Sequence, residues 1–216
     1  EFLEKSLKIQ KRVLGPHHLD LAHTYNMIAD MHLSSGDAEA CIPHFQSARE
    51  IYEFSGESDS VDMAILLSNL ALANEEIGEE EEALSLYKSA LSVRLKQDEQ
   101  VSGNLPKNHP EMKTRKLAIA DIYGHMGMLL DEAGDQDAAM EMYEKALSLR
   151  KNYRMSKDDD SAVADILHNI CIVHRTRGDY LQALKCYLKS LPILRKVLGG
   201  ESYLEIADTY INIGLM

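Results

Sequence analysis

Tryptophan is absent from this chain of 216 residues, and phenylalanine occurs only 3 times. A single large core of aromatic side chains is therefore not expected, and a composition that is 45% hydrophobic suits many small contacts between helices. No stretch approaches eighteen consecutive apolar residues, and the first residues form an amphipathic helix pattern without the apolar centre of a signal peptide. Membrane insertion is therefore not expected.

Positive charge is also scarce, because 23 Lys and Arg stand against 35 Asp and Glu, which gives a formal net charge of −12. Phosphate binding needs clustered cations that displace counterions, so nucleic acid is not expected as a partner. Cysteine occurs 3 times, with no close pair at metal-site spacing, and no Asn-x-Ser/Thr acceptor is present. These features favour the cytoplasm or another reducing intracellular compartment.

The chain contains one sequence motif that is repeated four times. Each of four glycines has an alanine fourteen residues upstream and Phe or Tyr nine residues downstream. The glycines are Gly36, Gly78, Gly134 and Gly178, the alanines are Ala22, Ala64, Ala120 and Ala164, and the aromatics are Phe45, Tyr87, Tyr143 and Tyr187. Glycine intervals of 42, 56 and 44 residues suit a unit of two helices that must stack on copies of itself.

The first helix of each unit, helix A, carries apolar residues three and four apart that end in a small residue. The small residues are Ala29, Ala71, Gly127 and Cys171. Packing selects size at this position, so Cys171 is expected to be a buried packing residue, as is Cys41 at a position that holds alanine in the other units. The repeated glycine then turns the chain into the second helix, helix B.

These residues resemble the tetratricopeptide repeat, and the resemblance covers nearly the whole chain. The 42-residue period and the loop from Leu14 to Ala22 look like the kinesin light chain and nephrocystin-type subfamily. The resemblance implies an all-α, right-handed solenoid of antiparallel helix pairs with about ten helices and with helix A on the concave face.

The predicted organisation is a single array that is truncated at both ends. Residues 1–14 are the tail of a preceding helix B, 15–56 repeat 1, 57–98 repeat 2, 99–109 an inserted loop, 110–155 repeat 3 with an extended helix A, 156–199 repeat 4, and 200–216 helix A of repeat 5. Gly103 and Pro106 mark the loop, and Pro110 suits the first turn of a helix.

Proteins similar to this chain hold extended peptides or partner helices on the concave face. The candidate partner-binding residues here are His23, Asn26, Asn69, Asp121, His125, Asp165, His168, Asn169, Arg175 and Asn212. A carboxamide both donates and accepts, so Asn can pair with both backbone groups of a peptide. The alternative is that each Asn bonds within its own helix or to water, and for Asn26 this alternative is favoured.

The charge of this face differs from that of the cargo groove of kinesin light chains, which is basic and takes acidic peptides. Acidic residues predominate around the candidate positions: Asp30, Glu75, Glu76, Asp121, Asp131, Glu132, Asp165 and Asp208. A basic or neutral ligand is therefore expected.

Catalysis, cofactors and metal ions have no support in the sequence. His18 and His109 fall at one loop position and His32 and His174 at one helix position, so repetition explains them structurally. No phosphate loop, Gly-x-Gly-x-x-Gly, His-Glu-x-x-His or Gly-x-Ser-x-Gly occurs.

Three hypotheses follow. The first is a binding and scaffolding module, such as an adaptor, with its partner on the concave face. The second is a structural segment of a larger complex, held by edge and convex contacts. The third is part of an enzyme whose catalytic domain lies outside this chain.

Overall fold

The computed structural model describes residues 2–102, 105–106, 108–153, 158–198, 209 and 211–214. Within these ranges the structure is helical apart from short turns, and it holds no strand. The helices are α1 (Phe2–Leu14), α2 (Leu19–Ser34), α3 (Ala38–Phe54), α4 (Val61–Glu76), α5 (Glu80–Ser102), α6 (Pro110–Glu132), α7 (Gln136–Asn152), α8 (Asp158–Thr176) and α9 (Tyr180–Leu198). Residues 211–214 are also helical, where helix A of repeat 5 is predicted.

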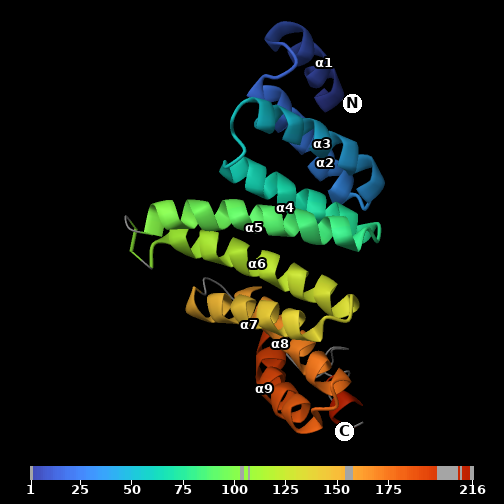
Figure 1. The fold of residues 1–216 in the computed structure, drawn as a ribbon, viewed down its shortest axis with the longest axis vertical. Helices are drawn as coiled ribbons and strands as arrows, with labels where there is room; N and C mark the ends of the chain where they lie inside the picture. Colours follow the sequence, from blue (N-terminus) through green and yellow to red (C-terminus); the bar gives the residue numbers. More distant parts are fainter. Residues whose placement is uncertain are drawn as a thin grey trace. The chain divides into compact units, whose positions relative to one another are not determined.

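Successive helices pack as antiparallel hairpins, with α2 against α3, α4 against α5, α6 against α7, and α8 against α9 (Figure 1). Contacts between α3 and α4, and between α7 and α8, join one hairpin to the next. The predicted fold class, an all-α solenoid of antiparallel helix pairs, is confirmed. The chain forms two compact units, residues 1–104 and 105–216, and a continuous array across both stays a prediction.

The turns inside the hairpins depend on the repeated glycines. All four adopt positive φ, for example 76° at Gly36 and 82° at Gly134, a conformation that ends a helix and that only glycine adopts without strain. The residue after each of these two glycines then caps helix B. Asp37 accepts a hydrogen bond from the backbone N–H three residues ahead at 3.2 Å, and Asp135 does the same at 3.1 Å.

Two of the loop histidines cap helix A. Nδ1 of His18 accepts a hydrogen bond from the backbone N–H of Asp20 at 3.2 Å, and Nδ1 of His109 accepts from Glu111 at 3.3 Å. The structural interpretation of these repeated histidines is therefore confirmed, and the role is an N-cap.

The core is built from the small residue of helix A and the aromatic residue of helix B. The repeated aromatic residues Phe45, Tyr87, Tyr143 and Tyr187 are all buried. Gly127 is needed where it stands, because a Cβ atom added there would lie 2.6 Å from Cε1 of Tyr143. Ala71 and Cys171 occupy the same position in other repeats and are fully buried. Packing therefore selects size at this position, as predicted.

α5 continues further into the inserted segment than the sequence predicts, whereas an extended helix A of repeat 3 was already expected. The loop was expected from 99 to 109, but α5 continues to Ser102, so it has 23 residues where α3 has 17. α6 also has 23 residues, whereas α2 and α4 have 16, so the insertion extends α6 at its N-terminal end. Gly103 lies outside the described residues. The insertion therefore lengthens two helices and leaves a short connection.

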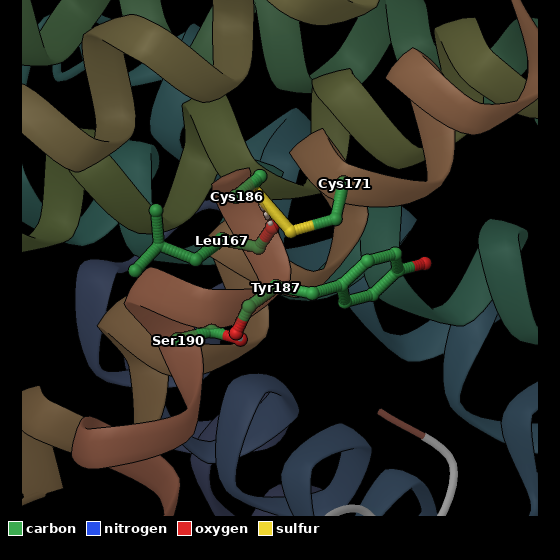
Figure 2. Close-up of a disulfide and its surroundings, with 5 residues drawn as sticks. All are labelled: Leu167, Cys171, Cys186, Tyr187 and Ser190. Carbon is green, nitrogen blue, oxygen red and sulfur yellow. Dashed lines mark hydrogen bonds between the residues drawn. A yellow bond between two sulfur atoms is a disulfide. The ribbon is translucent and has the colours of Figure 1, made fainter. Parts of the chain in front are cut away.

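A disulfide joins Cys171 of α8 to Cys186 of α9, with a Cα–Cα distance of 5.4 Å (Figure 2). Cys41 is free and buried, and burial raises the pKa of its thiol to about 11. Cys41 and Cys171 are fully buried, which confirms their expected packing role, but the disulfide between Cys171 and Cys186 was not predicted. Because the reducing compartment was inferred in part from the cysteines, the compartment stays a prediction.

The surroundings of the disulfide are tightly packed. Sγ of Cys186 lies 3.2 Å from the carbonyl oxygen of Leu167, and Oγ of Ser190 donates a hydrogen bond to the carbonyl oxygen of Tyr187 at 2.9 Å (Figure 2). A disulfide sulfur carries no proton, so the first of these is a contact, and Sγ of Cys186 can donate a hydrogen bond there only after the disulfide has been reduced.

Candidate functional site: a hollow between two A helices

The surface between α6 and α8 is hollowed, and four of the predicted binding residues line it. The hollow has a volume of about 130 Å³. Its lining comprises Ala120, Asp121, Gly124, His125 and Met128 from α6, Tyr143 and Arg150 from α7, and Ala162, Asp165, Ile166 and Asn169 from α8. We call this site the α6–α8 hollow. Both helices belong to the same compact unit.

The repeat explains why these residues meet. α7 packs against both α6 and α8, so residues at equivalent positions of the two A helices flank the side chains that α7 presents between them. Asp121 and Asp165 each follow the repeated alanine directly, and His125 and Asn169 lie four residues further on, one helical turn away. Gly124 has no side chain to fill the space, and nothing lies within 4 Å of where its Cβ would be.

The electrostatics of the hollow combine two carboxylates with one guanidinium. Arg150, on α7, donates a hydrogen bond through Nη2 to Oδ1 of Asp121 on α6. The Arg150 side chain is 12% exposed, so this ion pair is shielded from solvent on the arginine side. Burial, with the negative charges of Asp131 and Glu132, raises the pKa of Tyr143, which keeps the phenol protonated.

The pairing of Asp121 with Arg150 has a counterpart in repeat 1. There Oη of Tyr52 lies 3.3 Å from Nδ1 of His23, and each pair spans 29 residues of sequence. In both repeats the residue after the helix A alanine contacts the residue seven positions after the repeated aromatic of helix B. Sequence analysis missed Arg150 and Tyr52, although the common interval of 29 residues was a usable signal.

Asn26 contacts the same tyrosine and lies one position out of register with the other asparagines. It precedes the core residue Ile28 by two positions, whereas Asn69 directly precedes Leu70. Nδ2 of Asn26 donates to Oη of Tyr52 at 3.4 Å, a bond within its own helix pair. The residue of repeat 1 that matches Asn69 is Met27, which is 56% exposed.

The remaining predicted residues make contacts between neighbouring helices. Nδ2 of Asn69 donates to Oδ1 of Asp30 at 2.9 Å and thereby links α4 to α2. Burial raises the pKa of Asp30, and this hydrogen bond partly offsets the shift.

Arg175 and Asn212 form a similar link at the other end of the described chain. Arg175 donates through Nη1 to Oδ1 of Asn212, which joins α8 to the helical residues 211–214. The His168 ring lies edge-on to Tyr187, with 6.0 Å between centroids. The ten predicted residues therefore form several local clusters, and the α6–α8 hollow is the one that gathers four of them.

Two kinds of site have no representative in the described part of the chain. No helix there is long and apolar enough to cross a membrane, and no three His, Cys, Asp or Glu side chains gather where they could hold a metal ion.

Comparison with known proteins agrees with the repeats and the hairpins. Models of the tetratricopeptide repeat match residues 24–96, 120–153 and 162–216. The chain belongs to the tetratricopeptide repeat family. Proteins built from such repeats are generally scaffolds for protein interactions, and the chain resembles kinesin light chain arrays in fold.

Among solved structures, BtubC (BKLC) from P. vanneervenii has a TM-score of 0.73 at 22% identity, over 92% of this chain and 72% of that one. A putative kinesin light chain from Podosopora anserina with nearly identical repeats has a TM-score of 0.63 at 15% identity, over 92% and 86%. A clustered mitochondria protein homolog from Brugia malayi is 27% identical over 199 residues. That match covers 90% of this chain but only 12% of the relative's length.

Proposed function

We propose that this chain is a non-catalytic protein-interaction module whose A-helix surface holds an extended peptide or a helix of a partner protein, as an adaptor or scaffold does. The observation that carries the proposal is the α6–α8 hollow. It brings together Asp121, His125, Asp165 and Asn169, four of the residues that the repeat register and the resemblance to tetratricopeptide repeat proteins gave as candidates.

The size and lining of the hollow suit one side chain of a bound peptide. Its volume of about 130 Å³ is that of about four water molecules. Met128 and Ile166 offer apolar contact at the wall, while the carboxamide of Asn169 offers both a donor and an acceptor for a peptide backbone. Polar groups that fix orientation within an otherwise apolar pocket are typical of binding sites.

The charge of the hollow favours a basic or neutral ligand. Two carboxylates outnumber one guanidinium in the lining, and the whole chain carries −12. The ion pair between Arg150 and Asp121 reduces this preference, because it neutralises one of the two carboxylates locally. We therefore expect a moderate preference for basic peptides that weakens as salt rises.

The test is an array of short synthetic peptides that are basic, neutral or acidic, followed by calorimetry on the tightest binder. Asn169→Ala should weaken binding by about tenfold, the effect of losing one or two hydrogen bonds. Asp165→Asn should weaken the basic peptides more than the neutral ones. Gln46→Ala, which removes the same amide group from an exposed position on α3, is the matched control and should change nothing. Equal affinity in all variants with helicity retained would favour the assembly-segment hypothesis instead.

A further inference from the structure

The outer face of α9 differs from that of every other helix B that follows a repeated glycine. The comparison counts from the repeated small residue of helix B, which is Cys41 in α3, Ala83 in α5, Ala139 in α7 and Ala183 in α9. The positions two before, five after and nine after it are Leu181, Leu188 and Pro192 in α9, Glu39, Gln46 and Glu50 in α3, Glu81, Lys88 and Ser92 in α5, and Asp137, Glu144 and Ser148 in α7. Leu181 is 64% exposed and Leu188 is 55% exposed. An apolar stripe therefore replaces a polar one.

This exposure belongs to the repeat and does not depend on where the chain ends. The equivalent residues of α3 and α7 are all exposed, although both of those helices have packed neighbours on each side. The outer face of a helix B therefore stays open when the next helix A is in place.

The same face of α9 is basic. In a chain with 35 acidic residues, α9 contains no Asp or Glu, and its cations are Lys185, Lys189, Arg195 and Lys196. Steps of 100° per residue place these four residues within the same sector of the helix as Leu181, Leu188 and Pro192. Lys196 also forms an ion pair with Asp160 at 3.0 Å.

A second hollow continues this face at its C-terminal end. It has a volume of about 400 Å³ and lies where α7, the start of α8 and α9 meet. Its lining comprises Arg150, Lys151, Asp160, Val163, Pro192, Ile193 and Lys196. Three cations, one carboxylate and three apolar residues line it, so this hollow has the same mixed character as the α9 face. We call the exposed face of α9 and this second hollow together the basic strip, and we define the basic strip by Leu181, Lys185, Leu188, Lys189, Pro192 and Lys196.

We propose that the basic strip docks an acidic amphipathic helix of a partner protein. Leucines on the partner would pack between Leu181 and Leu188, which are two helical turns apart, and its carboxylates would pair with Lys185 and Lys189. A helix is about 10 Å wide, so it covers far less of the surface around α9 than a membrane would. An anionic membrane fits less well, because an extended negative plane would also meet the acidic outer residues of the other B helices, such as Asp137 and Glu144.

The test measures fluorescence anisotropy of a synthetic helical peptide of about 20 residues, which carries Leu along one face and Glu on the others. A peptide of the same composition, scrambled so that the leucines share no face, is the ligand control. The double variant Leu181→Asp/Leu188→Glu introduces the residues that α7 carries at the same positions, so the fold should be kept. Lys88→Glu places the same charge at the equivalent exposed position of α5 and is the matched protein control.

We expect the amphipathic peptide to bind at least about tenfold tighter than the scrambled one, with an affinity that falls as salt rises. The double variant should lose this difference, while Lys88→Glu and Asn169→Ala keep it. The proposal is overturned if the two peptides bind alike, or if Asn169→Ala and not the double variant removes binding. It is also overturned if the protein shows no preference for the amphipathic peptide and the leucines are instead needed for a different interaction. That interaction would be seen either as flotation of the protein with phosphatidylserine vesicles or as a dimer in sedimentation.

Discussion

Two glycines of α6 allow the packing of one repeat to be tested against an internal control. Gly124 and Gly127 both lie inside the helix, so replacing either with alanine should stabilise the helix by about 1 kcal/mol through propensity alone. A Cβ at Gly124 meets nothing within 4 Å. A Cβ at Gly127 would lie 2.6 Å from Cε1 and 2.7 Å from Cδ1 of Tyr143, a ring that is 2% exposed.

The difference between the two variants isolates the steric term. Overpacking of a core costs about 1–3 kcal/mol, so Gly124→Ala should be more stable than Gly127→Ala by that amount. We expect the cost to be finite because repeat 2 buries Ala71 and Tyr87 at the two equivalent positions. Gly127→Ala should therefore move Tyr143 and reshape the α6–α8 hollow that it lines.

The assay is denaturant unfolding followed by far-UV circular dichroism. Adding Tyr143→Leu completes a double-mutant cycle, and in that background Gly127→Ala should no longer be penalised. Equal stabilisation by the two alanines in the unmodified chain would refute the reasoning, because it would mean that the ring yields without cost.

Three further predictions concern other parts of the fold. Reduction of the disulfide between Cys171 and Cys186 with dithiothreitol should lower the free energy of unfolding by about 3 kcal/mol, the chain-entropy value for a loop of about fifteen residues. Cys171→Ala, which cannot form the disulfide, is the control. The prediction is contradicted if reductant lowers the melting temperature of the wild type no more than that of Cys171→Ala. His18→Ala should destabilise the chain by about 1 kcal/mol because α2 loses its N-cap, and His18→Asn should restore most of this in the same unfolding assay. Burial raises the pKa of Tyr52 from 10.0 to about 12, so its contribution to stability is present below pH 10 and is lost as pH rises toward 12. Tyr52→Phe should flatten that part of the pH profile, and an identical slope in both proteins would show that this phenol does not contribute.

The helix pairs were predictable because their determinants are local and steric. Ala22, Gly36 and Phe45 each satisfy a requirement for size or backbone conformation that recurs at the same spacing in every unit. The start of the inserted loop was not predictable in this way. Gln97 is buried and its Nε2 donates to the backbone oxygen of Asp59 at 2.8 Å, a contact across 38 residues that holds α5 in place just before the expected loop.

The site was partly predictable for the same reason. Equivalent positions in the repeat identified Asp121 with Asp165 and His125 with Asn169. The contact of Arg150 in α7 with Asp121 depends instead on how the two helices of a hairpin face each other. The disulfide was missed on similar grounds, since Cys171 and Cys186 are separated by 15 residues and meet only because the turn at Gly178 folds α9 back on α8.

The interval of 29 residues that joins Asp121 to Arg150 defines two facing positions in each hairpin, and the residues at these positions differ from repeat to repeat. Repeat 2 holds Ile65 and Arg94 at the two positions, and repeat 4 holds Asp165 and Leu194. A single exchange in repeat 2, Ile65→Asp, would reproduce the combination found in repeat 3 without altering the alanine, glycine or aromatic positions that build the frame, because Ile65 is 43% exposed. Leu194 is instead part of the core of repeat 4, so the same exchange is not open there. The residues at these two positions are thus distinct from the residues that build the frame of the repeat, so in repeat 2 the exposed position can change while the packing of the helix pair stays as it is.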